Sequence, residues 1–296
     1  MESGPSRGTD VAIYVLFRAG GRSPTEEPVS TRSKGDTLFA ANTLENRVAF
    51  ITGGAGDIGF DIAQTYGRLG AKVVIASRNQ ERLKSALDQL HGQDIEAKAM
   101  ITDVRDPDQV KRAINDTVSE YGSLDILVNN AAGNFHCPTA GLTPNGWKTV
   151  IDIDLNGTFY CCLAAYEHLK RSAHGGNIIS IITMLGVMGW PGAAHAAAAK
   201  AGILSLTRTL AVEWGDDNIR VNTISPGPIG DTEGVKRMYL DTGRGELERR
   251  KTALGRFGAK SDISNAAVYL ASDMASYVTG ENIVVDGGRW LKYVAA

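Results

Sequence analysis

The chain has 296 residues and a formal net charge of −2, with 43% hydrophobic and 22% charged residues. These values are typical of a globular protein with a large core, and the near-neutral charge gives no reason to expect a nucleic-acid partner. No apolar run reaches the roughly 18 residues that a membrane-spanning helix needs, so no membrane span is expected. Three cysteines without framework spacing favour a reducing compartment, and no Cys/His cluster has metal-ligand spacing, so no metal site is expected.

Residues 1–43 differ in composition from the rest of the chain. They are rich in Gly, Ser, Thr, Arg and Pro, and only the stretch 11–17 is apolar. That stretch is short for a signal-peptide core and is not followed by a convincing small-residue cleavage site. We therefore expect a disordered extension. A transit segment is the alternative, which four acidic residues oppose: Glu2, Asp10, Glu26 and Glu27.

From residue 44 onward, short apolar segments alternate with amphipathic ones. The apolar segments are of the buried parallel-strand type and occupy 48–51, 73–77, 126–128, 177–181, 221–225 and 282–285. Helical patterns lie between them, for example at 60–66, 81–90 and 109–118. This alternation predicts an α/β fold with one Rossmann-type, doubly wound parallel sheet and helices on both faces. Because no linker composition interrupts it, residues 44–296 are expected to form one domain.

A glycine-rich segment, Thr52–Gly59, stands between the first predicted strand and the helix that follows it. Its glycines allow the backbone to turn tightly and to approach a pyrophosphate, whose charge the helix N-terminus stabilises. The cofactor contacts expected in this loop are Gly53, Ala55, Gly56, Asp57 and Ile58. Asp57 occupies a place where glycine is usual, and its carboxylate would repel phosphate unless it points away.

The second predicted strand ends in Ser77 and Arg78 rather than in an acidic residue. An aspartate there would bind the ribose 2′-hydroxyl of NAD, whereas an arginine can pair with the 2′-phosphate of NADP. We therefore expect NADP(H) as the cofactor; a solvated charge at a helix start is the alternative interpretation of Arg78. Ligands bind at the carboxyl edge of such sheets, so further cofactor contacts are expected at Asp103, Val104 and Asn130.

The chain resembles the short-chain dehydrogenase/reductase family over residues 44–290. The motifs that carry the resemblance occur in the family's order and spacing, namely Thr52–Gly59, Asn129–Gly133, Lys200, Pro226–Ile229 and Val285–Gly288. The resemblance implies that Lys200 holds the nicotinamide ribose. It also implies cofactor contacts from Pro226, Gly227, Ile229 and Thr232.

The tyrosine that usually completes this family's active site is missing. It would stand four residues before Lys200, where this chain has Ala196. The 2,4-dienoyl-CoA reductases of the peroxisomal type, the branch that the chain most resembles, also lack it. The mitochondrial type uses a tyrosine fifteen residues before the lysine, and here that residue is Leu185. The closer resemblance is carried by the stretches 130–135, 147–154, 195–200 and 226–234.

By resemblance, two carboxylates take over proton handling, with a water held between them. They are Asp154, where ordinary family members have asparagine, and Asp286. A cap or first-turn acid at a helix start is the alternative for Asp154, and a structural role is the alternative for Asp286. Thr183 stands in the place of the usual catalytic serine and is expected to hydrogen-bond the substrate. His195 is expected to be structural rather than a proton donor.

The resemblance implies NADPH-dependent reduction of 2,4-dienoyl-CoA to 3-enoyl-CoA in the β-oxidation of unsaturated fatty acids. The expected substrate contacts are Arg78, Arg105 and Arg237 for the CoA phosphates, and Phe135 and Asn145 for the acyl or pantetheine path. The charged segment 236–251 suits a mobile lid or a solvated helix pair. Two alternatives stay open, a trans-2-enoyl-CoA reductase and a catalytically inactive NADP-binding protein.

The resemblance also implies a homodimer or homotetramer and a peroxisomal location. The alanine run 196–199 permits close helix packing, as at an oligomer interface. The chain ends in Lys292–Ala296 without a Ser-Lys-Leu type address, so cytoplasmic and mitochondrial locations are the alternatives.

Overall fold

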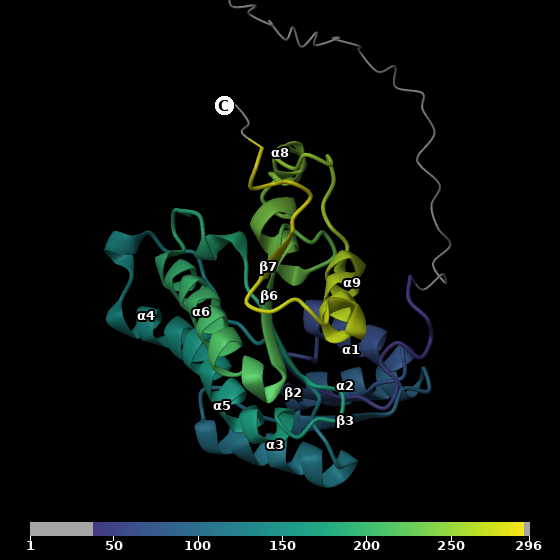
Figure 1. The fold of residues 1–296 in the computed structure, drawn as a ribbon. Helices are drawn as coiled ribbons and strands as arrows, with labels where there is room; N and C mark the ends of the chain where they lie inside the picture. Colours follow the sequence, from purple (N-terminus) through teal and green to yellow (C-terminus); the bar gives the residue numbers. More distant parts are fainter. Residues whose placement is uncertain (1–37, 293–296) are drawn as a thin grey trace, which may run out of the picture. The chain divides into compact units, whose positions relative to one another are not determined.

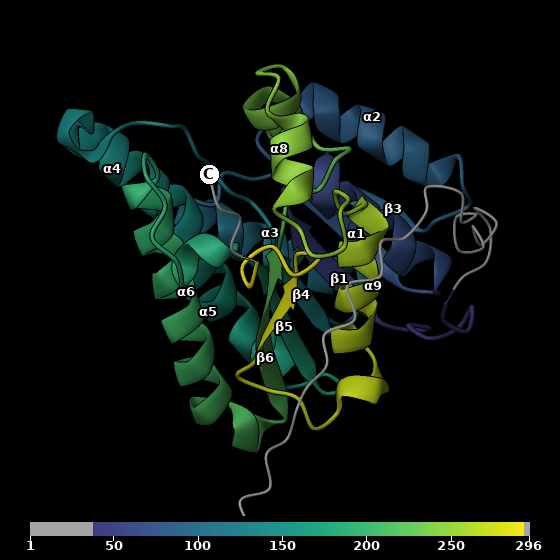
Figure 2. The ribbon, with the colours of Figure 1, turned by 90° about the horizontal axis from the view of Figure 1, so that it is seen from above.

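The computed structural model describes residues 38–292, and within them the strands form a single parallel sheet. Its seven strands run in the order β3-β2-β1-β4-β5-β6-β7, and helices cover both faces (Figures 1 and 2). The strand order reverses between β1 and β4, which creates the crevice where such sheets bind ligands. The predicted fold class is confirmed.

The strands agree with the predicted segments to within one or two residues at each end. They are β1 (Val48–Thr52), β2 (Lys72–Ser77), β3 (Ala97–Ile101), β4 (Ile126–Asn129), β5 (Gly176–Ile181), β6 (Ile219–Pro226) and β7 (Asn282–Val285). Only β3 had no predicted range, because its sequence, AKAMI, is not a continuous apolar run. It lies at the edge of the sheet and is half exposed, so burial does not require such a run.

Some of the helices begin or end where the local sequence provides caps. They are α1 (Asp57–Arg68), α2 (Gln80–His91), α3 (Pro107–Tyr121), α4 (Pro144–Ile151), α5 (Gly157–Leu169), α6 (Ala194–Glu213), α7 (Glu233–Val235), α8 (Gly245–Arg250) and α9 (Lys260–Ala271). Asn79 accepts the N–H of Arg82 at the start of α2, and Asp106 accepts two N–H groups at the start of α3. α3 ends at Gly122, whose φ of 82° is easy only for glycine.

The core has two layers, one on each face of the sheet, because strand side chains alternate between the faces. Ile51, Ile75 and Val128 point to the layer that also contains side chains of α1, α2 and α9. Phe50 pairs in register with Val74 and Leu127, and these point to the opposite layer, under α3, α5 and α6. Apolar side chains therefore fill the space between the sheet and the helices on both faces.

Phe39 and Leu44 mark the start of the described chain. Phe39 packs against the core, and Leu44 is buried with its N–H donated to the carbonyl of Leu69 at 2.9 Å. Most of the expected extension, residues 1–37, lies outside the described residues, as do residues 293–296. Between 38 and 292, no helix has the length and apolarity to cross a bilayer, and no three His, Cys, Asp or Glu side chains gather as metal ligands.

Candidate active site

Every strand of the sheet is followed, within two residues, by a side chain or glycine that the sequence predicts to be functional. In chain order these are Gly53, Arg78, Asp103, Asn130, Thr183, Gly227 and Asp286. Parallel strands end at the same edge of a sheet, so all of them lie at one carboxyl edge. The topology thereby assembles the predicted site from seven separate parts of the chain.

The glycine-rich loop after β1 has the shape of a dinucleotide cradle. Gly56 precedes α1 without a side-chain cap, which leaves the first N–H groups of the helix facing outward for an anion. Gly53 has a φ of 64°, and a Cβ there would lie 2.8 Å from Nδ2 of Asn130. A Cβ on Gly59 would lie 2.4 Å from the same atom. The side chain of Asn130 thus fixes the start of the loop by donating to the carbonyl oxygens of Thr52 and Gly53 at 3.2 Å.

Asp57 adopts a left-handed conformation, with a φ of 47°, at the first residue of α1. Aspartate tolerates this conformation better than most residues do, although glycine is the easier choice. Its Oδ1 lies 3.4 Å from the backbone nitrogen of Glu233 and 3.9 Å from Nζ of Lys260. The carboxylate therefore faces α7 and an ammonium group, which offsets the repulsion that the sequence predicts toward a phosphate.

Two arginines meet one carboxylate at the ends of β2 and β3. Arg105 binds both oxygens of Asp103, at 3.0 and 2.5 Å, and Nη1 of Arg78 lies 3.9 Å from Oδ2 of Asp103. The hydrogen bonds from Arg105 lower the pKa of Asp103, and the pair raises the pKa of Arg105 in turn. Both arginine side chains stay well exposed. This cluster holds two positive charges at the edge where a phosphate would arrive.

A buried ion pair lies at the centre of the same edge. Nζ of Lys200 lies 3.1 Å from Oδ2 of Asp154, and the two side chains are 7% and 1% exposed. Oδ1 of Asp154 accepts the N–H of Gly133 at 2.7 Å, and Lys200 also donates to the carbonyl of Ile181 at 3.3 Å. Three elements therefore converge on this pair: the loop after β4, the end of β5 and α6.

The suggestion that Asp154 caps a helix start is wrong. Asp154 lies within a π-helical turn, Asp152–Asn156, that joins α4 directly to α5. Such a turn carries one extra residue and reorients the side chains around it, and it is frequent at functional sites. Asp152 takes the outer side, where it pairs with Lys148 and accepts from Asn156. The Lys148 hydrogen bond lowers the pKa of Asp152, while Asp154 is turned inward to Lys200.

Ala196 and Thr183 occupy the places of the usual tyrosine and serine. Ala196 is buried in α6, one turn before Lys200, so no hydroxyl group is available from this position. Thr183 follows β5, and its Oγ1 accepts the N–H of Leu185 at 3.1 Å. The hydroxyl hydrogen of Thr183 is not used by that bond and can be donated. Leu185 is the middle residue of the turn Met184–Gly186, and its apolar side chain has no acid–base function.

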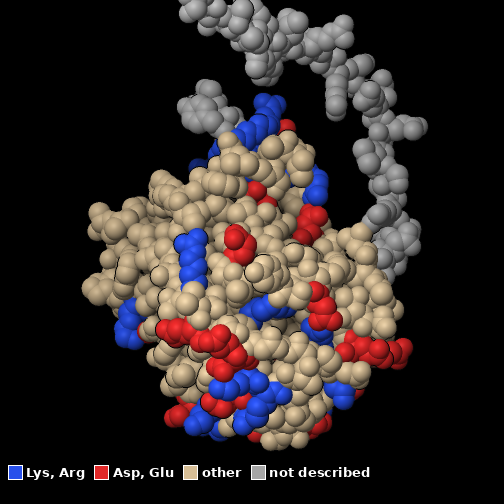
Figure 3. Space-filling model, viewed as in Figure 1, with Lys and Arg blue, Asp and Glu red and all other residues tan. Residues whose placement is uncertain are grey.

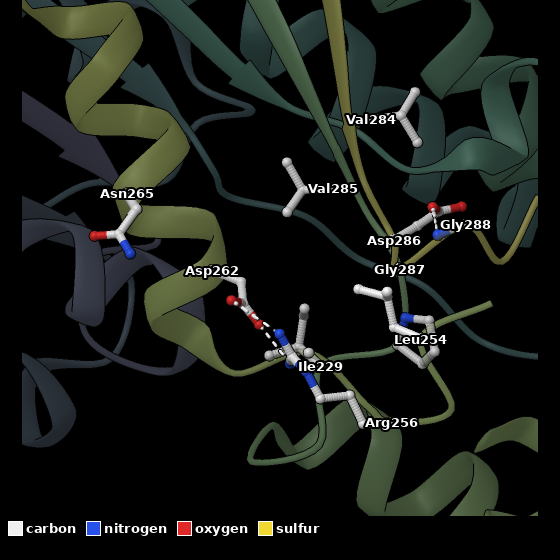
Figure 4. Close-up of a pocket in the computed structure, with 13 residues that line it drawn as sticks. Ile229, Leu254, Arg256, Asp262, Asn265, Val284, Val285, Asp286, Gly287 and Gly288 are labelled. Atoms are coloured by element: carbon white, nitrogen blue, oxygen red, sulfur yellow. Dashed lines mark hydrogen bonds and ion pairs between the residues drawn. The ribbon is translucent and has the colours of Figure 1, made fainter. Parts of the chain in front are cut away.

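Asp286 has a defined structural task in the turn after β7. It is 7% exposed, and its two oxygens accept the N–H groups of Gly288 and Trp290 at 2.8 and 2.9 Å. No hydrogen bond joins Asp286 to Asp154 within residues 38–292. Figure 4 shows Asp286 at the margin of a pocket of about 380 Å³ whose far wall carries the Arg256–Asp262 ion pair.

The turn after β7 is tied to the charged segment 236–251 by residues that the sequence reasoning missed. Glu248 in α8 is buried and binds Arg289 at 3.2 Å and Lys251 at 2.6 Å. The guanidinium of Arg289 also lies 5.5 Å from the ring centre of Trp190. Figure 3 shows basic side chains at the top of the view, where Figure 1 places α8. The segment forms short helices, the π-helical turn Lys236–Leu240 and α8, as the helix-pair alternative expected. The ion pair between Glu248 and Arg289 connects α8 to the turn after β7.

Several predicted contact residues have local structural partners. Thr232 caps α7 by accepting the N–H of Val235 at 3.3 Å, and it donates to Ile229 at 2.8 Å. Val104 packs so closely on α5 that a Cβ on Gly157 would lie 2.8 Å from it. The remaining predicted positions lie in separate elements: Ala55 in the cofactor loop, Ile58 in the first turn of α1, Ser77 at the end of β2, Pro226, Gly227 and Ile229 at and after the end of β6, Phe135 in the loop after β4, Asn145 in α4 and Arg237 in the π-helical turn Lys236–Leu240.

A family model described as enoyl-(acyl carrier protein) reductase matches residues 53–289. A crystal structure titled as a short chain dehydrogenase, from Bacillus anthracis, matches with a TM-score of 0.77 and 39% identity, over 85% of this chain and 100% of that one. The chain belongs to the short-chain dehydrogenase/reductase family. The family resemblance is confirmed, and membership implies an oxidoreductase that uses a nicotinamide dinucleotide, a group that the cradle after β1 fits.

Similar curated proteins carry dienoyl-CoA reductase names. One from Pongo abelii, a "peroxisomal 2,4-dienoyl-CoA reductase [(3E)-enoyl-CoA-producing]", is 45% identical over 86% of this chain and 88% of its own length. One from Bacillus subtilis, a "probable 2,4-dienoyl-CoA reductase [(2E)-enoyl-CoA-producing]", is 41% identical over 84% and 98%. The similarity to this branch is therefore confirmed over nearly all of the described chain.

Proposed function

We propose that this protein is an NADPH-dependent 2,4-dienoyl-CoA reductase that forms 3-enoyl-CoA. The observation that carries the proposal is the buried pair of Asp154 and Lys200 beside Ala196. Ala196 removes the phenol that an alcohol-reducing member of the family would use, and the pair leaves a carboxylate and an ammonium group one helical turn from that position. The identity of 41–45% to proteins with dienoyl-CoA reductase names supports the same activity.

The reaction adds a hydride and a proton to opposite ends of a conjugated thioester. NADPH, when bound, supplies the hydride, which forms a C–H bond at C5 of the dienoyl chain. The electron pair moves through the conjugated bonds onto the thioester carbonyl, and a proton then forms a C–H bond at C2. The product is 3-enoyl-CoA, and NADP⁺ is the oxidised partner, so hydrogen and charge balance.

Lys200 is proposed to provide the positive charge that this redistribution needs. Its ammonium group is held by Asp154 and the carbonyl of Ile181, which restrain its position before substrate binds. Charges in a dry site act more strongly than charges in water and need no reorganisation. From this position Lys200 is proposed to bind the nicotinamide ribose, and Thr183 to donate its hydroxyl hydrogen to the substrate.

Asp154 and Asp286 are proposed to hold the water that delivers the proton. Each of their oxygens already accepts one hydrogen bond from the protein, which fixes both carboxylates. A carboxylate oxygen has a second lone pair, so a water between the aspartates can keep one hydrogen bonded to a carboxylate and direct the other at C2. When that hydrogen is transferred to C2, the hydroxide that remains takes up a proton from solvent, which restores the water.

Arg78 is proposed to select NADPH by pairing with its 2′-phosphate. Asp103 orients the guanidinium from one side, while more than half of the Arg78 side chain stays exposed for the ligand. The other proposed cofactor contacts are Gly53, Ala55, Gly56, Asp57, Ile58, Ser77, Asp103, Val104, Asn130, Pro226, Gly227, Ile229 and Thr232. Proposed substrate contacts are Arg78, Arg105 and Arg237 for the CoA phosphates, and Phe135 and Asn145 for the acyl or pantetheine path.

The deciding experiment uses the purified chain, NADPH and a short 2,4-dienoyl-CoA. We expect loss of the dienoyl and NADPH absorbances at equal rates, and no consumption of a 2-enoyl-CoA under the same conditions. Binding of NADPH without turnover would favour the inactive-binder alternative. Faster turnover of the 2-enoyl-CoA would favour the enoyl reductase alternative.

The position of the remaining double bond separates two products. The Pongo abelii relative is named for a 3E product and the Bacillus subtilis relative for a 2E product. A 3E product requires protonation at C2, the carbon next to the thioester, whereas a 2E product requires protonation at C4. Chromatography of the product against both standards decides between them, and we expect the 3E isomer.

Compartment and assembly are proposed on the same similarity. A peroxisomal location is proposed because the named relatives in Pongo abelii and Arabidopsis thaliana are called peroxisomal, and a fluorescent fusion tests it. A homodimer or homotetramer is proposed because α5 exposes Phe159 and Leu163, which are 43% and 59% accessible in the single chain. Light scattering of the purified protein would show a monomer if this proposal is wrong.

A further inference from the structure

His195 lies at the start of α6 with a fully buried side chain. Its Nδ1 accepts the backbone N–H of Ala196 at 2.8 Å. A ring nitrogen that accepts a hydrogen bond carries no hydrogen, so the neutral imidazole holds its hydrogen on Nε2. This Nε2–H is buried and has no hydrogen-bond partner among residues 38–292.

A buried donor without an acceptor is unfavourable for the folded protein. The N–H loses its hydration and gains nothing in return, whereas a phenylalanine of similar size would fill the space without this cost. Buried polar groups in native proteins nearly always have partners, and the exceptions are often functional. The imidazole therefore indicates an acceptor that is supplied by a ligand.

The surroundings of His195 connect it to the reacting centre. The ring of Phe135 covers the imidazole edge-to-face, with 4.4 Å between ring centres, and Phe135 is 43% exposed. Two residues earlier on the same loop, the N–H of Gly133 binds Asp154. Lys200 lies five residues after His195 on α6, about 7.5 Å along the helix axis and about 140° around it, so the two side chains leave α6 in different directions. The loop 133–135 connects them instead, because it contacts Asp154 at Gly133 and His195 at Phe135.

The acceptor that fits this position is an oxygen at the far end of a conjugated acyl group. In a 2,4-dienoyl thioester, the carbon that accepts hydride and the carbonyl oxygen lie at opposite ends of an extended planar unit. The rise of about 7.5 Å along α6 between His195 and Lys200 is comparable with the length of this conjugated unit. A neutral N–H donor binds such an oxygen more tightly as negative charge accumulates on it, which lowers the barrier.

We propose that His195 binds the substrate, with its Nε2–H donated to the thioester carbonyl oxygen after the ring of Phe135 turns outward. This inference rests on the proposed function and assigns a new residue to the acyl site. His195 donates a hydrogen bond and keeps its hydrogen, so the source of the transferred proton is unchanged. The exposure of Phe135 gives its ring solvent space into which it can turn.

Two substitutions separate the hydrogen bond from the shape of the ring. His195→Phe keeps an aromatic ring and removes the donor, whereas His195→Gln keeps an N–H at a similar reach. We expect kcat on 2,4-dienoyl-CoA to fall about 10²–10³-fold in His195→Phe, as when one oxyanion donor is removed. We expect His195→Gln to retain activity within about tenfold of wild type, and both variants to bind NADPH as wild type does.

The unfolding temperature separates the proposed role from a purely structural one, because a structural histidine would be needed for stability and not for turnover. In the free protein the Nε2–H has no partner, so His195→Phe loses only the hydrogen bond from the Ala196 N–H to Nδ1, and its unfolding temperature should fall by no more than about 5 °C. The matched control is His91→Gln. In the wild type, Nε2 of His91, at the end of α2, lies 3.0 Å from the carbonyl oxygen of Ala97, outside the proposed acyl site. The control should leave turnover unchanged.

A binding measurement without NADPH tests the hydrogen bond directly. Polarisation of a conjugated thioester carbonyl moves its absorbance to longer wavelength, so dienoyl-CoA bound to wild type should show a red shift that His195→Phe loses. Wild-type turnover in His195→Phe, or a lower unfolding temperature with normal turnover, would overturn the inference and leave the proposed function standing. A red shift without any wild-type turnover would overturn the proposed function while supporting the bond from His195.

Discussion

The charged groups in the two halves of the carboxyl edge differ in their exposure to water. After β2 and β3, the cluster of Arg78, Asp103 and Arg105 stands in contact with water, with arginine side chains 57% and 41% exposed. Around α6, the pair of Asp154 and Lys200 is almost completely dry. The first arrangement suits a group that recognises phosphate on arrival, and the second suits a group that must act on a reacting bond.

The difference in burial sets how much each charge contributes. Exposed ion pairs are weakened by water and salt and are worth less than about 1 kcal/mol. A buried charge that loses its partner costs several kcal/mol, because neither water nor another group replaces it. The same type of substitution should therefore have very different effects in the two halves, and Asp286, fixed by backbone N–H groups, should lie between them.

The largest effect is expected from neutralising the buried carboxylate. Asp154→Asn should lower kcat about 10³-fold, within the range of general acid–base groups, and leave NADPH affinity within about threefold. Asp286→Asn should lower kcat about 10–100-fold. If both hold one water, the double variant should be no slower than Asp154→Asn alone. Stopped-flow single turnovers measure the rate of the reduction step in each variant. A double variant whose rate loss equals the product of the two single losses would show that the two carboxylates act separately.

Next comes the stability of the buried half. Lys200→Met leaves Asp154 buried without its cation, so the free energy of unfolding should fall by about 3–5 kcal/mol. Combining Lys200→Met with Asp154→Asn should restore part of that loss. The control is Lys148→Met, because Lys148 is 72% exposed in its pair with Asp152 and should cost less than about 1 kcal/mol. Urea unfolding measures the free energy of unfolding of each variant. Equal losses in Lys200→Met and Lys148→Met would show that burial does not set the contribution of these ion pairs.

In the exposed half, the effect should fall on ligand binding rather than on folding. Arg78→Ala removes a charge-assisted bond worth about 1.5–3 kcal/mol, so the KM for NADPH should rise about 10–150-fold. The KM for NADH should not change, since NADH has no 2′-phosphate. Arg82→Ala, an exposed arginine of α2, is the control. An equal rise in the KM values for NADPH and NADH would mean that Arg78 does not bind the 2′-phosphate.

The smallest effect is a pH-dependent contribution of Asp103 to stability. Arg105 lowers the pKa of Asp103 in the folded state, so its stabilising effect is present above the unfolded pKa of about 3.9. That effect disappears as pH falls through the lower folded-state pKa. Asp103→Asn should therefore cost less than about 1 kcal/mol at pH 7 and nothing at a pH well below that folded-state pKa. Thermal unfolding over this range, at low and high salt, checks both the sign and the size.

Much of the fold follows from local patterns. Continuous apolar runs identify β1, β2, β4, β5 and β6 because these strands are buried on both faces. Of the two edge strands, β7 has an apolar run although it is only partly buried, and β3 has none. Amphipathic patterns identify α1, α2 and α3, and capping side chains mark the starts of α2 and α3. Glycine spacing likewise identifies the cofactor loop, since the close approach of Asn130 leaves no room for a Cβ on Gly53 or Gly59.

The functional roles of acidic residues could not be read from spacing alone. Asp152 and Asp154 look equivalent in the sequence, and only the π-helical turn directs one outward to Lys148 and the other inward to Lys200. Glu248 and Arg289 are 41 positions apart, so nothing local indicates their buried contact. Such contacts depend on which helix packs against which strand end.

By itself, the sequence determined a doubly wound sheet, a dinucleotide loop after β1 and an active site without the usual tyrosine. Each depends on local rules: the burial of parallel strands, the absence of a Cβ in glycine, and the chemistry of the side chain at position 196. Only the tertiary structure decided that Asp154 is dry and paired, that Asp286 is bound by backbone N–H groups, and that Nε2 of His195 lacks a partner. Burial and hydrogen bonding are properties of neighbours brought together by folding, and they set the charge and reactivity of these groups.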